Sequence, residues 1–163
     1  RGKAALFWDI QYIPTSFHRV NSDMHLLVVN GPNLNLLGKR EPDVYGHTTL
    51  ADLENELRNV FPDIEFSFVQ SNHEGKLIDA LQNTSANGII LNGAGFTHTS
   101  VALRDAVASI DTPVVEVHIS NIAAREDFRH TSLTAAECVG AIFGLGIQGY
   151  HLAVQFFLSR KSD

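Results

Sequence analysis

A carboxylate and an imidazole lie two residues apart in the apolar segment Val114-Val115-Glu116-Val117-His118. Side chains at this spacing share one face of a strand, and a buried acid needs a partner. The pattern indicates a histidine whose tautomer is fixed by a carboxylate and which serves as a general acid or base. A core histidine beside a structural carboxylate gives the same pattern, so both interpretations stay open at this point.

A second set of reactive groups follows the aliphatic run Leu26-Leu27-Val28-Val29. The loop after this run carries the amide of Asn33, the cations Lys39 and Arg40, and the phenol of Tyr45. Connections this long without secondary structure are uncommon unless they are functional. A solvated surface turn is the plain interpretation. Together with the segments below, the loop is predicted to be a mobile lid over an active site.

Two more polar segments follow apolar runs. His98 lies between threonines, where it either binds a polar ligand or caps the next helix. The segment Ile119-Ser120-Asn121 comes directly after the strand that carries His118, at the start of a short helical segment near Ala123. Backbone N–H groups at such a start bind anions. Ser120 as a simple helix cap is the alternative, and both roles are compatible.

Several other kinds of site are not supported. None of the eight histidines has the HExxH spacing or another metal-ligand spacing, so no metal is expected. The lysines lie in the termini, the lid or a polar helix start, which leaves no candidate for a buried Schiff base. The segment Gly144-Leu145-Gly146-Ile147-Gln148-Gly149 matches G-x-G-x-x-G, but the chain ends before the acidic residue that holds the ribose. Close packing of the last helix on its strand is the better interpretation of these glycines.

Composition limits the class of protein. The chain has 163 residues, 44% hydrophobic residues and a formal net charge of -6, which predicts one globular domain. The negative charge argues against nucleic acid or an anionic membrane as the main partner. A single cysteine, Cys138, fits a reducing cytoplasm. Residues 1–23 precede the first convincing strand and are predicted to be a leader outside the domain of residues 24–163.

Strands and helices alternate along the rest of the chain. Strands are expected over residues 25–30, 64–70, 88–91, 113–118 and 138–143, and helices over about 49–60, 74–83, 100–110 and 146–158. This alternation predicts a flavodoxin-like α/β fold of three layers with a five-stranded parallel sheet in the order 2-1-3-4-5. Strand two is expected at an edge. The polar segments then meet at the carboxyl ends of the strands, in one crevice.

These segments together resemble the type II 3-dehydroquinate dehydratase family from Met24 to Ser159. The resemblance rests on six blocks in the family's order and spacing: Asn30-Gly31-Pro32-Asn33-Leu34-Asn35-Leu36-Leu37-Gly38; Arg40-Glu41-Pro42 with Tyr45-Gly46; Gln70-Ser71-Asn72-His73-Glu74-Gly75; Thr97-His98-Thr99-Ser100-Val101-Ala102-Leu103-Arg104-Asp105; Glu116-Val117-His118-Ile119-Ser120-Asn121; and Gly144-Leu145-Gly146-Ile147-Gln148-Gly149-Tyr150.

The resemblance implies a lyase of the shikimate pathway or of quinate breakdown. Such an enzyme dehydrates 3-dehydroquinate reversibly to 3-dehydroshikimate, through an enolate and an overall anti elimination, without metal, cofactor or Schiff base. By the same resemblance Tyr45 is the base, Arg40 lowers its pKa, and Asn33 helps to hold the enolate oxygen. His118 protonates the departing hydroxyl, and Glu116 orients His118.

The resemblance also implies how the substrate is held. Its carboxylate is expected on the backbone of Ile119 and Ser120, and its hydroxyls on Asn92, His98 and Arg129. A further residue, Asp105, is expected to reach the site of a neighbouring subunit in a dodecamer of four trimers. The family more often has Pro-Gly-Ala or Ala-Gly-Gly after the asparagine, whereas this chain has Gly93-Ala94-Gly95.

Two other functions compete with the lyase. A flavodoxin-like module that binds a phosphate-bearing cofactor would use the same crevice and the late glycines, and would be indifferent to Tyr45→Phe. A structural oligomer whose lid is an interface loop would show no turnover.

Overall fold

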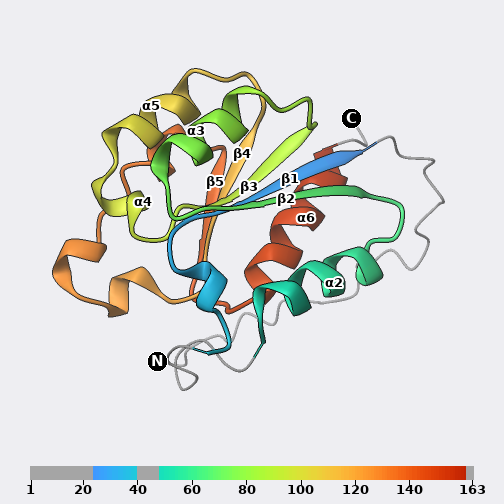
Figure 1. The fold of residues 1–163 in the computed structure, drawn as a ribbon, viewed down its shortest axis with the longest axis horizontal. Helices are drawn as coiled ribbons and strands as arrows, with labels where there is room; N and C mark the ends of the chain where they lie inside the picture. Colours follow the sequence, from blue (N-terminus) through green and yellow to red (C-terminus); the bar gives the residue numbers. More distant parts are fainter. Residues whose placement is uncertain (1–23, 40–47, 161–163) are drawn as a thin grey trace, which may run out of the picture.

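A five-stranded parallel sheet forms the centre of the protein (Figure 1). The structure, a computed structural model, describes residues 24–39 and 48–160. The strands are β1 (His25–Asn30), β2 (Glu65–Gln70), β3 (Gly88–Asn92), β4 (Val114–His118) and β5 (Gly140–Phe143). Their order is β2-β1-β3-β4-β5, which confirms the predicted topology and the edge position of the second strand.

Helices cover both faces of this sheet, as predicted. The helices are α2 (Leu50–Val60), α3 (Glu74–Gln82), α4 (Phe96–Thr99), α5 (Val101–Ala108) and α6 (Gln148–Arg160), with short 3-10 helices η1 (Leu34–Leu36), η2 (Ile122–Ala124), η3 (Asp127–Arg129) and η4 (Ala135–Glu137). Helices α2 and α6 lie on one face, and α3, α4 and α5 lie on the other (Figure 1).

Strand β1 shows why its sequence is aliphatic throughout. Leu26 and Val28 belong to the hydrophobic core beneath α2 and α6. Leu27 and Val29 belong to the core beneath α3 and α5. A strand buried on both faces has no position for a polar side chain until it ends, which is where the polar loop begins.

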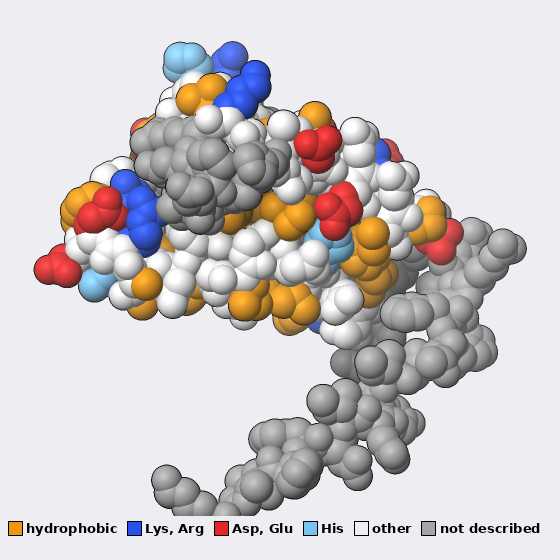
Figure 2. All heavy atoms as spheres, turned by 90° about the horizontal axis from the view of Figure 1, so that it is seen from below, with side chains coloured by type: hydrophobic (Ala, Val, Ile, Leu, Met, Phe, Trp, Pro, Cys, Tyr) orange, Lys and Arg blue, Asp and Glu red, His pale blue; other side chains and the backbone are white. Residues whose placement is uncertain are grey.

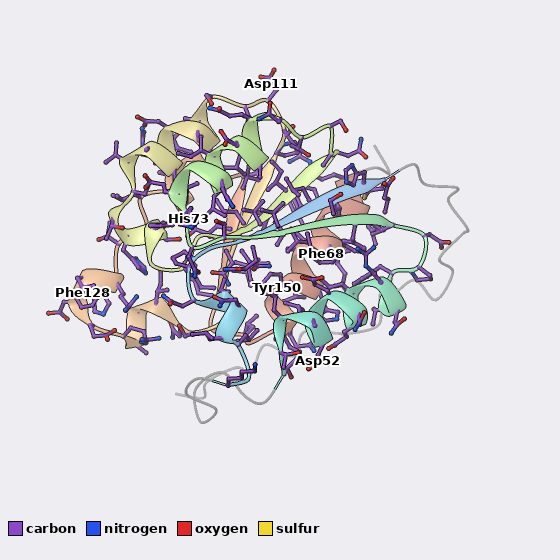
Figure 3. All side chains as sticks on the ribbon, viewed as in Figure 1. Asp52, Phe68, His73, Asp111, Phe128 and Tyr150 are labelled. Carbon is purple, nitrogen blue, oxygen red and sulfur yellow. The ribbon has the colours of Figure 1, made fainter. Side chains whose placement is uncertain are left out.

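The start of α2 is fixed by a capping box at the expected position. The N–H of Asp52 donates to the Thr49 hydroxyl at 3.2 Å, and the Asp52 carboxylate accepts from the Thr49 N–H at 2.9 Å. Figure 3 shows Asp52 at this end of the helix. Leu53 and Leu57 are fully buried on the inner face.

Several predicted boundaries were wrong by about two residues, including the end of α5 at Ala108 rather than 110 and the end of α6 at Arg160 rather than 158. The last helix begins at Gln148 rather than residue 146, because Gly146 turns the chain with a φ of 60°. The last strand begins at Gly140, because the N–H of Cys138 closes η4 by donating to Ala135 O at 3.2 Å. The sequence also gave no indication of α4 as a separate helix; extended backbone at Ser100 divides it from α5.

The described surface carries both signs of charge. On the face shown in Figure 2, lysine and arginine side chains lie mainly at the top and at the left, and acidic side chains lie at the left and over the right half. Within residues 24–39 and 48–160, no helix combines the length and the apolar character required to cross a bilayer. Residues 1–23, the predicted leader, lie outside the described residues.

Candidate active site

The carboxyl ends of β1, β3 and β4 open into one pocket, as predicted for a topological switch point. Its lining includes seven of the predicted site residues: Asn33, Asn92, His98, His118, Ile119, Ser120 and Arg129. Three segments that are far apart in the sequence, after β1, β3 and β4, therefore meet at one place.

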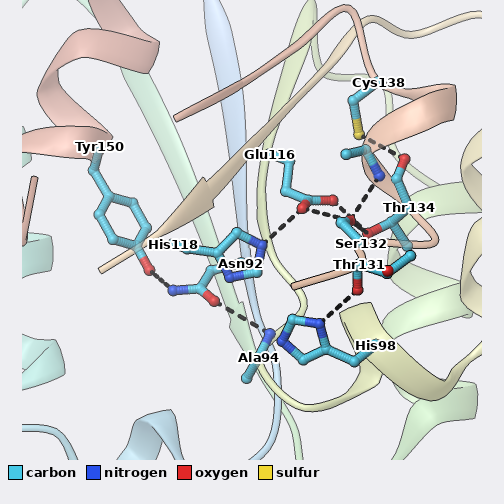
Figure 4. A network of polar contacts seen from close by, with 11 residues as sticks. Asn92, Ala94, His98, Glu116, His118, Thr131, Ser132, Thr134, Cys138 and Tyr150 are labelled. Carbon is cyan, nitrogen blue, oxygen red and sulfur yellow. Dashed lines mark hydrogen bonds and ion pairs between the residues drawn. The ribbon is translucent and has the colours of Figure 1, made fainter. Parts of the chain in front are cut away.

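Glu116 and His118 form the predicted pair. The N–H at Nε2 of His118 donates to Oε1 of Glu116 at 2.7 Å, and both side chains point to the same face of β4 (Figure 4). The carboxylate is fully buried, whereas the imidazole lines the pocket. The carboxylate fixes the tautomer and leaves Nδ1 of His118 as the ring nitrogen that can act on a ligand. This geometry favours the acid or base interpretation over a purely structural pair.

His98 lies beside this pair. Its ring stacks on that of His118 with centroids 6.0 Å apart, and its Nδ1–H donates to the carbonyl of Thr131 at 2.8 Å. The cap of the following helix is Ser100, whose hydroxyl accepts from the N–H of Leu103 at 2.7 Å. The helix-cap interpretation of His98 was therefore wrong. The bond to Thr131 occupies Nδ1 and orients the ring, which leaves Nε2 as the nitrogen that can bind a ligand.

A buried tyrosine holds the amide of Asn92. The Nδ2 group of Asn92 donates to the Tyr150 hydroxyl at 2.8 Å, and this hydroxyl donates to Oδ1 of Asn30 at 2.7 Å. Oδ1 of Asn92 accepts from the N–H of Ala94 at 3.2 Å. These bonds fix which way the amide points, so that Asn92 offers an N–H rather than a carbonyl to the pocket. Burial raises the pKa of Tyr150, so this phenol stays protonated and is no candidate for a base.

Replacing Tyr150 with phenylalanine should lower the free energy of unfolding by about 1–3 kcal/mol. The change keeps the ring but leaves two buried amide groups, Oδ1 of Asn30 and Nδ2 of Asn92, without their shared partner. Urea unfolding followed by circular dichroism measures this loss. A stability equal to that of the parent chain would contradict it.

The predicted enolate ligand Asn33 lies in left-handed backbone with a φ of 67°. Its backbone N–H donates to Oδ1 of Asn72 at 2.9 Å. The amide of Gln70 donates to the same oxygen and to Gly31 O, at 3.2 Å each. The sequence alone indicated no role for the segment that begins at Gln70. In the structure, Gln70 and Asn72 position the start of the polar loop after β1.

The loops after β1 and β3 lie in close contact. The N–H of Gly31 donates to the carbonyl of Asn92 at 2.8 Å. A Cβ on Gly31 would overlap the backbone carbonyl of Gly93, so glycine is required here by space rather than by backbone angle. This contact holds Asn33 and Asn92 on the same side of the pocket.

The segment after β4 contributes two guanidinium groups. Arg125 and Arg129 both line the pocket; Arg125 donates to the Ser120 hydroxyl at 3.4 Å, and Arg129 donates to Glu126 at 2.9 Å. Asn121, not Ser120, caps η2 by accepting from the N–H of Ala123. The simple-cap interpretation of Ser120 was therefore wrong. Arg125 also pairs with Glu126, at 3.3 Å, so one carboxylate offsets part of the charge of the two guanidinium groups; the net positive charge that remains favours an anionic ligand.

The unusual loop Gly93-Ala94-Gly95 places alanine in left-handed backbone, with a φ of 49° at Ala94. This conformation costs an L-residue about 1–2 kcal/mol. Ala94→Gly should therefore raise the free energy of unfolding by about 1 kcal/mol. Thermal unfolding of the two chains tests this, with Ala108→Gly in helix α5 as a control that should destabilise.

The predicted residues that do not line the pocket fall into three groups. Tyr45 and Arg40 lie outside the described residues. Glu116 lies behind His118, as its orienting role requires. Asp105 lies on α5 with an exposed side chain, where Arg104 donates to its carboxylate at 2.8 Å, so this chain alone does not bring it into the pocket. In the part of the chain that the structure describes, no group of three or more His, Cys, Asp or Glu could hold a metal ion.

Comparison with known proteins assigns the chain to a family. The family profile described as dehydroquinase class II matches residues 24–158. The chain belongs to the class II dehydroquinase family. It is 58% identical over 133 residues to a 3-dehydroquinate dehydratase of Exiguobacterium sp., covering 80% of this chain and 92% of that protein. It is 56% identical over 142 residues to one of Bacillus licheniformis, covering 85% and 98%.

Solved structures of class II dehydroquinases have the same fold. The type II dehydroquinase of Butyrivibrio crossotus has a TM-score of 0.80 and 44% identity, and the match covers 82% of this chain and 97% of that one. That of Propionibacterium acnes has a TM-score of 0.78 and 38% identity, covering 85% and 99%. The resemblance stated from the sequence blocks is thereby confirmed.

Some features of this dehydroquinase site were not predicted. Ser132 and Thr134 bond Glu116, Tyr150 orients Asn92, and Arg125 lines the pocket. The late glycines do pack the last helix, since a Cβ on Gly149 would lie 3.1 Å from Val117. Hydrophobic periodicity in the sequence does not mark a hydroxyl in a loop or a tyrosine inside a helix as a site residue. Their proximity to the site became clear only from the folded structure.

Proposed function

We propose that this chain catalyses the reversible dehydration of 3-dehydroquinate to 3-dehydroshikimate, as a lyase of the shikimate pathway or of quinate breakdown. Family membership and the names of its relatives support this activity. The observation that carries it is the buried Glu116 beneath His118, at a pocket that also holds Asn92, His98 and two arginines.

The proposed reaction begins with Tyr45 as the base. Tyr45 removes a proton from the carbon next to the ketone, and the electron pair of the broken C–H bond forms an enolate. A free tyrosine has a pKa near 10, and lowering it to about 7 requires roughly 4 kcal/mol. The permanently charged Arg40 can supply most of this free energy only where water is excluded. The lid therefore closes before proton transfer.

The second step expels the hydroxyl group. The enolate collapses to the ketone, the new C=C bond forms, and the C–O bond breaks while Nδ1 of His118 supplies the proton that makes the leaving group water. Asn33 helps to hold the enolate oxygen; a lost donor of this kind typically costs about 2.7–4 kcal/mol. Its position on the pocket wall, fixed by Asn72, supports this role.

The rest of the pocket holds the substrate. Its carboxylate lies on the backbone of Ile119 and Ser120, and Asn92, His98 and Arg129 bind its hydroxyls. The positive charge of the pocket supports binding of an anion. No cofactor takes part in this scheme.

The active assembly is a cytoplasmic dodecamer of four trimers, in which Asp105 reaches the site of a neighbouring subunit. The exposed position of Asp105 on α5, away from its own pocket, supports this arrangement.

The test is a turnover assay with 3-dehydroquinate, followed by the absorbance of the conjugated enone, with and without sodium borohydride. The expected result is turnover that borohydride leaves unchanged. Absence of turnover would refute the function. Inactivation by borohydride in the presence of substrate would instead show a lysine imine and refute the enolate route.

A further inference from the structure

The Glu116 carboxylate has more hydrogen-bond donors than orientation of His118 requires. Besides His118, the hydroxyl of Ser132 donates to Oε1 at 2.7 Å, and the hydroxyl of Thr134 donates to Oε2 (Figure 4). Glu116 and Thr134 are both fully buried. Each carboxylate oxygen is thus held by at least one donor from the segment between β4 and β5.

The direction of the Ser132 bond is fixed by the backbone. The N–H of Ala135 donates to the Ser132 oxygen at 2.9 Å, so the hydroxyl hydrogen of Ser132 is directed to the carboxylate. The two hydroxyl oxygens lie 3.3 Å apart. If Glu116 were protonated, its own O–H would compete with the hydroxyls of Ser132 and Thr134, which already donate to the carboxylate. At least one of these two hydrogen bonds would then be lost.

The three donors also lower the pKa of Glu116 by more than burial raises it. Burial raises the pKa of Glu116, but the hydrogen bonds from His118, Thr134 and Ser132 together hold this pKa below its ordinary value. The other ionisable groups near the pair are His98, stacked on His118, and Cys138, beside Thr134. Arg104, on α5, donates to Glu137 and Asp105.

We propose that Ser132 and Thr134 are positioning residues that keep Glu116 ionised, so that the proton carried by His118 goes to the substrate and not to the carboxylate. This rests on the proposed role of His118 as the acid. To act as the acid, the imidazole must carry a proton on each nitrogen, with Nε2–H bonded to Glu116 and Nδ1–H available to the substrate, while Glu116 stays ionised. Without the hydroxyl donors Glu116 competes for the proton of this imidazolium, and the carboxylate itself becomes protonated at higher pH.

The test compares four chains: the parent, Thr134→Val, Thr134→Ser and Thr112→Val. Thr134→Val removes the donor with little change in shape, and Thr134→Ser retains it. Thr112→Val is the matched control, because Thr112 precedes β4 at the end opposite the pocket and is not one of the residues that line it. The readouts are the pH profile of kcat, KM, and the ¹³C NMR titration of the Glu116 carboxyl group, assigned with Glu116→Gln.

In Thr134→Val the titration of Glu116 and the acid limb of kcat should both move up by about one pH unit. On the acid limb kcat should therefore fall about tenfold at a given pH, whereas at neutral pH kcat should stay close to that of the parent, and KM should change little. Thr134→Ser and Thr112→Val should follow the parent. Ser132→Ala should shift the same two readouts in the same direction and replaces Thr134→Val if that chain does not fold.

An unmoved Glu116 titration in a folded Thr134→Val chain, or an equal shift in Thr134→Ser, would overturn the proposal. A loss of kcat by the same factor at every pH would mean that Thr134 is only structural. The NMR titration does not require turnover. An inactive parent chain with the expected NMR shifts would therefore refute the enzyme function and the acid role of His118, while ionisation of Glu116 by the hydroxyls would stand.

Discussion

Replacing His118 with alanine should lower kcat by about 100- to 10,000-fold, the usual effect of a lost general acid. The hydroxyl would then leave as hydroxide, because the proton donor is lost. Among the described residues that line the pocket, His118 alone bonds the buried carboxylate of Glu116, at 2.7 Å. KM should change little, because His118 donates its proton mainly in the transition state. Steady-state kinetics below the melting temperature measures both constants.

The matched control is His25→Ala. His25 lies at the opposite end of β1, where its ring bonds the Ser67 hydroxyl at 2.8 Å, far from the pocket. This chain should keep the parent kcat. Near-normal turnover in His118→Ala would show that the carboxylate and imidazole pair is structural, which was the plainer interpretation of its sequence.

The second large effect is expected for Tyr45→Phe, which should reduce kcat by a similar factor of about 100 to 10,000. The chain has three tyrosines, and the buried Tyr150 is excluded as a base by its raised pKa and its two hydrogen bonds. Phenylalanine keeps the ring of Tyr45 and removes only the phenolic oxygen. Loss of turnover without loss of substrate binding would therefore identify that oxygen as the base.

Tyr12→Phe is the control, because Tyr12 lies in the segment before Met24, outside the family match. Full activity in Tyr45→Phe would end the base assignment. It would also fit a module that only binds a ligand, provided that the parent chain showed no turnover either.

Strands were the most predictable part of the fold. Leu26 to Val29 and Gly88 to Leu91 are apolar on both faces, so their sequences allowed a buried parallel strand and little else. Boundaries were less predictable where hydrogen bonds decide them. Cys138 belongs to an apolar run, yet its N–H serves η4 and cannot join the sheet.

The site was predictable where one strand carries the pattern. Glu116 and His118 are two apart, and the period of a strand was sufficient to pair them. The partners Ser132 and Thr134 come from a loop whose path depends on three short 3-10 helices, a kind of structure with no hydrophobic period to read. The exposed Phe128 in the same segment, which projects outward in Figure 3, gives no signal of the site either.

Gly31 sets a limit on attempts to widen the range of substrates by directed evolution. Any side chain there would push the loops after β1 and β3 apart and carry Asn33 and Asn92 with them. A combinatorial library should therefore leave codon 31 invariant and randomise the aliphatic wall at Leu34, Leu36 and Ile122 instead. Diversity at those three positions changes the shape of the pocket while the scaffold that aligns its polar groups is preserved.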